Sequence, residues 1–184
     1  MQRQLVQRAQ AGDHEAFSVL VRGSYPRLFG VARLILRDLD RAQDAVQEAL
    51  VLAWRDVRAL RDADSWDAWL NRLTVRACYR SAQKVRRRDV VELHVPPDEE
   101  AAALTDFSDA VVDRDHMGAA LARLPVDQRA VLVLHFYLGL PLTELAAVLD
   151  IPVGTAKSRL NRGLAAMRTF VGADRPTALL ERSA

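Results

Sequence analysis

The side chains best suited to specific chemistry lie near the end of the chain, where basic and amide residues recur within one short segment. Residues 153–172 include no acid and carry Lys157, Ser158, Asn161 and Arg162. Arginine and lysine match the acceptor edge of guanine, asparagine matches adenine, and serine can bond to either base. This pattern indicates hydrogen bonding to base edges in the major groove of DNA.

Two helices joined by a tight turn are needed to position those side chains. The second helix is predicted by an apolar stripe at three-four spacing, which turns the polar residues outward. Its members are Val153, Ala156, Leu160, Leu164 and Met167. The first helix has its own stripe of Leu142, Leu145, Ala146 and Leu149. Between them, Asp150 tolerates left-handed backbone and Pro152 suits a first helical turn, so the segment predicts a helix-turn-helix.

A second basic segment occurs earlier and is followed by an acidic one. The six basic residues are Arg76, Arg80, Lys84, Arg86, Arg87 and Arg88, and the eight acids that follow are Asp89, Glu92, Asp98, Glu99, Glu100, Asp106, Asp109 and Asp113. Clustered positive charge is typical of proteins that bind the phosphates of nucleic acids. The order of these segments, basic, acidic and then basic again, predicts two basic domains joined by an acidic connector.

The remaining periodic segments are all helical, so the sequence predicts an all-α fold of two small helical domains. Helices are expected near residues 4–11, from 13 onward, over 40–57, and from a cap at Ser65 to about 88. The second helix either bends or breaks near residues 23–26. Trp66 and Trp69 share a stripe with Leu70 and Leu73, which favours core packing over base stacking. Pro125 is expected to open a further helix with Val131, Leu132, Leu134 and Phe136 in the core.

Length and composition exclude several other classes of protein. The chain has 184 residues, 50% of them hydrophobic, and a single cysteine, Cys78, so it can bury real cores but cannot form an internal disulfide. Its start lacks the apolar stretch of a signal peptide, and no segment is long enough to span a bilayer. We therefore expect a soluble, cytoplasmic protein.

Four sequence blocks resemble the extracytoplasmic-function sigma factors, which are bacterial promoter-recognition subunits of RNA polymerase. They are Gly12 to Phe17, Asp44 to Ala49 with Trp54, Trp69 to Leu73 with the basic segment, and Leu124-Pro125 through Leu160. The last block is the most specific, because members usually read close to Pro-Val-Gly-Thr-Val-Lys-Ser-Arg, as residues 152–159 do here. The resemblance covers most of the chain, and it implies a protein with no catalytic residue, metal or cofactor of its own.

The resemblance implies a domain plan. Residues 1–88 are similar to sigma region 2, 89–114 form an acidic flexible linker, 115–171 are similar to the region 4 helix-turn-helix, and 172–184 form a tail. The implied partners are core RNA polymerase and promoter DNA, and the resemblance leaves open whether an anti-sigma factor also binds.

The same resemblance assigns residues to three surfaces. The residues expected to bind core polymerase are Asp44, Gln47, Glu48 and Val51. Those expected to bind the −10 element are Arg76, Arg80, Lys84, Arg86, Arg87 and Arg88. Those expected to bind the −35 element are Thr155, Lys157, Ser158, Arg159, Asn161 and Arg162. The chain departs from the family at Arg76 and Arg80, where members commonly carry asparagine and an acid, so Arg76 is expected to contact phosphate.

Three alternatives remain open from sequence. A stand-alone helix-turn-helix repressor would need a dimer surface and a palindromic operator. A metal-dependent hydrolase would have to use Asp98, Glu99, Glu100, Asp113 and His116, which lack zinc-ligand spacing. A polymerase-binding inhibitor of transcription would share the docking helix but would have no use for a recognition helix.

Overall fold

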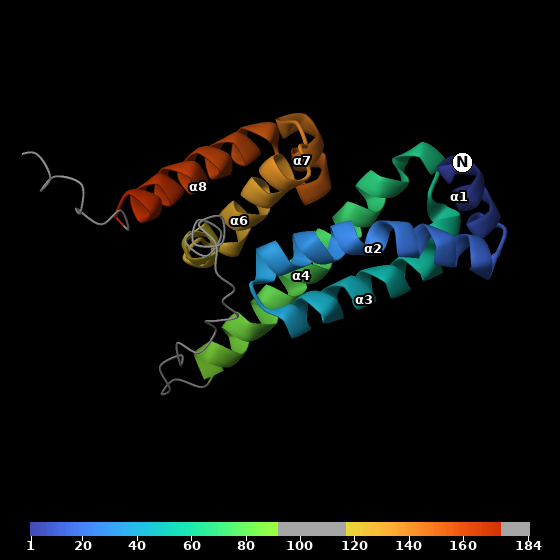
Figure 1. Ribbon diagram of the computed structural model, residues 1–184, viewed down its shortest axis with the longest axis horizontal. Helices are drawn as coiled ribbons and strands as arrows, with labels where there is room; N and C mark the ends of the chain where they lie inside the picture. The colour runs from blue at the N-terminus through green and yellow to red at the C-terminus, as the bar shows by residue number, and fades with distance from the viewer. Residues whose placement is uncertain (92–116, 174–184) are drawn as a thin grey trace, which may run out of the picture.

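The computed structural model describes residues 1–91 and 117–173, with side chains described up to residue 85 and from 117 to 170 (Figure 1). Every regular element in those ranges is helical, which confirms the all-α prediction. The elements are α1 (Gln2–Gln10), α2 (His14–Leu36), α3 (Leu39–Asp56), η1 (Val57–Ala59), η2 (Ala63–Ser65), α4 (Trp66–Val91), a short helix over 117–122, α6 (Val126–Leu132), η3 (Val133–Tyr137), α7 (Leu142–Leu149) and α8 (Val153–Ala173). Most of the predicted linker and tail lies outside the described residues.

Helices α1 to α4 form the N-terminal module, and local caps set where its helices begin. Gly12 turns the chain after α1 with a φ of 97°. Asp13 then caps α2, because its carboxylate accepts hydrogen bonds from the backbone N–H groups of Glu15 and Ala16. Asp38 caps α3 in the same way, by accepting from Arg41 N. The caps fix the first residues of α2 and α3. These two helices lie side by side, and both pack on α4.

Helix α2 runs unbroken through Pro26, so the break that the sequence allowed near residues 23–26 does not occur. It ends at Arg37, which adopts left-handed backbone with a φ of 58° and donates its N–H to Arg33 O. One face of α2 is fully buried, with Leu28, Val31 and Ile35 at 0% exposure. Helix α2 therefore runs from beside α1 toward the C-terminal module, whose α6 and η3 it contacts (Figure 1).

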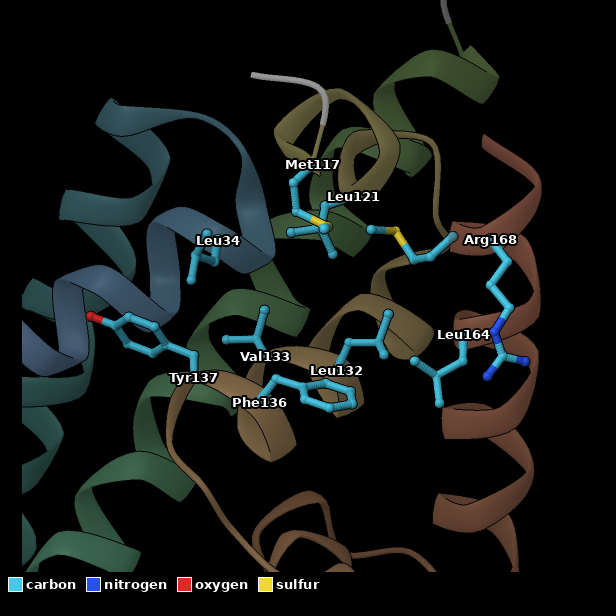
Figure 2. A pocket seen from close by; sticks show the side chains of 10 residues that line it. Leu34, Met117, Leu121, Leu132, Val133, Phe136, Tyr137, Leu164 and Arg168 are labelled. Carbon is cyan, nitrogen blue, oxygen red and sulfur yellow. The ribbon is translucent and has the colours of Figure 1, made fainter. Parts of the chain in front are cut away.

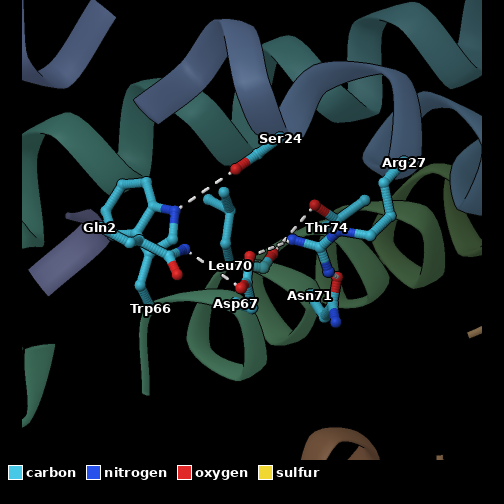
Figure 3. Close-up of polar contacts among 8 residues, drawn as sticks. All are labelled: Gln2, Ser24, Arg27, Trp66, Asp67, Leu70, Asn71 and Thr74. Atoms are coloured by element: carbon cyan, nitrogen blue, oxygen red, sulfur yellow. Dashed lines mark hydrogen bonds and ion pairs between the residues drawn. The ribbon is translucent and has the colours of Figure 1, made fainter. Parts of the chain in front are cut away.

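Polar contacts fix α4 against α2, as Figure 3 shows. Trp66 is fully buried, and its indole Nε1 donates to Ser24 Oγ at 3.4 Å. Arg27 donates to Asn71 Oδ1 at 2.7 Å and also pairs with Asp67. The prediction that Trp66 belongs to the core is confirmed. Ser65 precedes α4 as expected, but its hydroxyl donates to Asp62 Oδ2 at 2.7 Å.

The C-terminal module consists of α6, η3, α7 and α8. Pro125 was predicted to open this helix. It occupies the N-cap position instead, and α6 begins at the next residue, Val126. The predicted burial of Phe136 is wrong, since its side chain is 64% exposed. Phe136 lies two residues after Leu134 and five residues after Val131, and this spacing puts it on the other side of the helix from both buried side chains.

The two modules pack against each other in addition to being linked in sequence. Helix α2 contacts α6 and η3, and α4 contacts α7. One hydrophobic cluster of buried residues extends through both modules. The sequence predicted two bodies on a connector and gave no sign of this interface, because it is formed by residues far apart in the chain.

Candidate nucleic-acid interface

Helix α8 exposes a polar row over its N-terminal half. Lys157, Asn161 and Arg162 are exposed, whereas Ala156 is fully buried and Leu160 is 7% exposed. The buried apolar stripe of α8 therefore begins at Ala156, one turn later than predicted, because Val153 is 44% exposed. The free side of α8 therefore carries donors of the types that read base edges.

The turn before α8 has the backbone that its residues predict. Asp150 ends α7 in left-handed conformation, with a φ of 57° and a ψ of 48°. Ile151 N then donates to Ala146 O at 3.1 Å, and Ala156 N donates to Pro152 O at 3.0 Å. This corner lets α7 pack on α8 while leaving the outer face of α8 uncovered.

Ser158, one helical turn before Arg162, accepts two hydrogen bonds from the Arg162 side chain. The Arg162 guanidinium donates from Nη2 to Ser158 Oγ at 3.1 Å and from Nε to Ser158 O at 3.3 Å. Ser158 in turn donates its hydroxyl proton to Thr155 O at 3.1 Å. These bonds restrict the rotamers of a long exposed side chain, so less conformational entropy is lost when Arg162 meets a base.

Arg159 is directed away from that row, toward α4 and α6. Its Nε lies 3.2 Å from Asp127 Oδ2, and its side chain is only 25% exposed. The neighbouring Tyr79 is buried, which raises the pKa of its phenol to about 12. Of the six candidate −35 residues, Arg159 is thus the one that the structure separates from the exposed row.

The candidate −10 residues lie along α4, and two of them already have partners. Arg76 Nη2 lies 3.3 Å from Asp150 Oδ2 of the helix-turn-helix. Arg80 Nη2 lies 2.9 Å from Glu48 Oε1 of α3. Lys84 is exposed, whereas the side chains of residues 86–88 lie outside the described ones. Arg80 therefore links the candidate −10 helix to the candidate docking helix.

The candidate docking residues share the outer face of α3. Asp44, Gln47 and Glu48 are exposed, and Val51 is 63% exposed although it is apolar. On the opposite face, Val46 and Ala49 are fully buried.

A groove of about 710 Å³ between α2 and α3 adjoins that face. Gln47 and Val51 line it, and so do residues that were not predicted to take part in docking, among them Arg22 and Tyr25. Tyr25 is 38% exposed and stacks on Phe29, with ring centroids 5.9 Å apart. Its role could not be read from sequence, because a tyrosine near Pro26 gives no indication of which side of the helix meets a groove.

Within residues 1–91 and 117–173 no three histidine, cysteine or acidic side chains converge as metal ligands. The acids and histidine of the hydrolase alternative lie at residues 98–116, outside those ranges. None of the helices searched in those ranges combines the length and apolar character needed to cross a bilayer.

Comparison with protein families matches both modules. Residues 20–88 match the model for sigma-70 region 2, and residues 114–167 match the model for sigma-70 region 4. The two matches fall on α2–α4 and on the helix-turn-helix module.

Similar proteins and structures agree with these matches. The chain is 32% identical to the ECF RNA polymerase sigma factor SigM of Mycobacterium tuberculosis, over 88% of this chain and 80% of that protein. It is also 32% identical to the ECF RNA polymerase sigma-E factor of Escherichia coli, over 86% of this chain and 87% of that protein.

Among solved structures, CnrH in complex with the cytosolic domain of CnrY aligns with a TM-score of 0.67 and 25% identity, over 94% of this chain and 98% of that one. The sigma factor RpoE of Bartonella quintana, in complex with the anti-sigma factor NepR, shares the fold with a TM-score of 0.68 and 24% identity, over 86% of this chain and 98% of that one. The chain therefore belongs to the extracytoplasmic-function group of sigma-70 RNA polymerase sigma factors, as a non-enzymatic promoter-recognition subunit with regions 2 and 4.

Proposed function

We propose that α8 reads the −35 element through Lys157, Ser158, Asn161 and Arg162, with Thr155 near the DNA backbone. The observation that supports this most is the exposed row on the N-terminal half of α8, behind a turn with left-handed Asp150. Recognition helices enter the major groove by that half, so Lys157 and Arg162 are in position to reach base edges. Arg159 reaches the phosphate backbone only when its ion pair with Asp127 is broken.

We further propose that α4 serves the −10 element and that the basic segment holds strand phosphates. Arg76, Arg80, Lys84 and Arg86 to Arg88 supply the positive charge, and such contacts give affinity without sequence preference. Residues 1–88 form the region 2 module in this account and 115–171 form the region 4 module. The acidic segment 89–114 connects them, 172–184 form the tail, and the protein acts in the cytoplasm.

Core polymerase docks, in our proposal, on the outer face of α3 and the adjoining α2–α3 groove. Asp44, Gln47 and Glu48 offer acidic and amide groups to a basic partner, and Val51 offers an exposed apolar contact. Apolar and charged groups together suit a helical partner, with charge setting the register and apolar burial giving affinity.

An anti-sigma factor is a further candidate partner. The two similar solved structures named above are complexes, and the Bartonella quintana structure is described as one with an anti-sigma factor. Such a protein would block initiation by covering the docking or DNA-reading surfaces.

Two exposed valines provide a matched test of docking. Val51 lines the groove, whereas Val19 on α2 is 42% exposed and does not line it. Val51→Asp places a charge in the groove and should weaken binding of the full chain to core polymerase by about tenfold or more. Val19→Asp makes the same change outside the groove and should bind normally. Equal binding by both variants, measured by competition for core polymerase, would contradict the docking proposal.

A further inference from the structure

An ion pair between Glu48 and Arg80 joins two helices that are proposed to serve different partners. Arg80 of α4 donates from Nε and from Nη2 to the same oxygen, Glu48 Oε1 of α3, at 3.0 Å and 2.9 Å. The pair lies at the surface, since the Arg80 side chain is 48% exposed and the Glu48 side chain is 50% exposed. Helices α3 and α4 pack on each other, so the pair spans neighbouring helices of one module.

Each member of the pair has a second use that conflicts with the pair. Glu48 belongs to the face of α3 that is proposed to dock on core polymerase, and Arg80 belongs to the basic row of α4 that is proposed to hold strand phosphates. A carboxylate oxygen that already accepts two hydrogen bonds from a guanidinium attracts another cation less strongly, and that guanidinium attracts a phosphate less strongly. Either use therefore requires the pair to open.

The neighbouring residues of the same two rows are not paired in this way. Asp44 lies one helical turn before Glu48, and Lys84 lies one turn after Arg80. Both are exposed, and neither forms an ion pair with any of the described residues. Family members often carry an acid at the position of Arg80, and an acid there would repel Glu48, so the pair is a feature of this chain more than of its family.

Both members of the pair belong to the N-terminal module. The apolar pocket of about 770 Å³ in Figure 2 is lined by Leu34 of α2 and by residues of the C-terminal module, and neither Glu48 nor Arg80 lines it. A partner that fills this pocket would not compete for Glu48. The pair can therefore be tested on DNA that has no −35 element.

We propose that Glu48 and Arg80 exchange partners when the chain docks on core polymerase: a basic group of the polymerase takes over Glu48, and Arg80 then holds a phosphate of the −10 strand. In the free chain Arg80 stays on Glu48 and adds little to DNA binding, whereas Lys84 adds the same amount in both states. The inference rests on the proposed assignment of α3 to polymerase and of α4 to the −10 element.

The exposure of the pair sets how strongly the two surfaces can be coupled. An exposed ion pair contributes little to stability, so its opening costs little and the exchange can occur. The same weakness limits the coupling to about two- to fivefold in affinity. Because coupling between two binding sites is reciprocal, DNA bound at Arg80 strengthens docking at Glu48 by the same factor.

Arg80→Ala and Lys84→Ala form a matched pair, because each removes one exposed basic side chain from α4. The DNA is a forked template with a single-stranded −10 region and no −35 duplex, and its affinity is measured against salt concentration for the full chain alone and on core polymerase. One phosphate contact on single-stranded DNA contributes about 0.7 to the slope of log affinity against log salt. Lys84→Ala should lower the slope by about 0.7 in both states. Arg80→Ala should lower it by that amount only on core polymerase.

The exchange also predicts an effect of Arg80 on docking without DNA. Arg80→Ala should strengthen binding of the full chain to core polymerase by about two- to fivefold, because Glu48 no longer has to leave a partner. In a Glu48→Gln background Arg80→Ala should give no such gain, since the carboxylate for which arginine and polymerase compete is gone.

The exchange is overturned if Arg80→Ala changes the salt slope equally with and without core polymerase, or if it leaves docking unchanged. The proposed function is judged separately: if neither Lys84→Ala nor Arg80→Ala changes the slope on core polymerase, α4 does not hold the −10 strand. A slope lowered by Lys84→Ala on core polymerase, beside an Arg80→Ala chain that behaves alike in both states, would remove the exchange and leave the assignment of α4 intact.

Discussion

In the −35 reading that we propose for α8, Arg162 is the side chain on which base preference depends most directly. It is exposed, and the hydroxyl and carbonyl of Ser158 hold its guanidinium on the outer side of α8. A guanidinium held in this way is prepared for two parallel hydrogen bonds to the N7 and O6 acceptors of guanine. Lys157, on the same face, has no such restraint among the hydrogen bonds of the described residues.

Arg162→Ala should cost about 1–3 kcal/mol of promoter binding and relax preference at particular base pairs. Arg168→Ala removes the same charge from α8 well beyond its N-terminal half and should leave base preference unchanged. Holoenzyme affinity across templates randomised in the −35 element measures both effects. Uniform loss on every sequence would show that Arg162 only neutralises phosphate.

Asp13 gives a residue-scale prediction about pH. The backbone N–H of Ala16 donates to its carboxylate, and with the Arg8 side chain this holds the pKa of Asp13 below the ordinary value of 3.8. A carboxyl whose pKa is lower in the folded state stabilises that state above its unfolded pKa, and the stabilisation disappears as pH falls through the folded value. Asp13→Asn, which keeps an acceptor oxygen but not the charge, should therefore lower Tm at neutral pH.

The Tm difference between wild type and Asp13→Asn should shrink as the pH approaches and passes below 3.8. Thermal unfolding followed by circular dichroism over a pH series measures it. A difference that is the same at every pH would mean that the cap acts only through its hydrogen bonds.

At the scale of elements, residue type predicted the helix-turn-helix well. The left-handed Asp150, the stripe of Leu145, Ala146 and Leu149, and the burial of Ala156 were all predicted and are all observed. Local rules suffice there because backbone preference and helical periodicity involve only neighbours in sequence. Phe136 was wrongly assigned to the core, because its helical spacing from Val131 and Leu134 puts it on the other side of the helix, where it is 64% exposed.

Asp150 should respond to substitution according to backbone conformation. Left-handed backbone costs about 1–2 kcal/mol for an ordinary side chain and almost nothing for glycine, whereas a β-branched residue is disfavoured further. Asp150→Gly and Asp150→Val both remove the ion pair to Arg76, so their difference isolates the backbone term.

Chemical denaturation should find Asp150→Gly more stable than Asp150→Val by about 1–2 kcal/mol. Equal stability would indicate that the turn relaxes out of left-handed geometry when α7 meets α8.

At the scale of the whole molecule, sequence predicted the modules but not their interface. The contacts of Arg129 with Ile35 and of Tyr137 with Gly30 join residues about a hundred positions apart, and neither residue pair forms a recognisable motif. The candidate sites show the same limit. Asp44 and Glu48 lie on the face predicted for them, yet the pairing of Glu48 with Arg80 and of Arg76 with Asp150 emerges only from tertiary packing.

The central claim is that two helical modules, mounted on core polymerase, read two DNA elements and open the duplex. Open-complex formation on a set of candidate promoters, scored by the reactivity of unpaired thymines, tests it most directly. We predict strand opening on a subset of templates with the full chain and core polymerase together, and none with either alone. Opening by no template in the presence of both, or opening that does not depend on the sequence of the −35 element, would contradict the account.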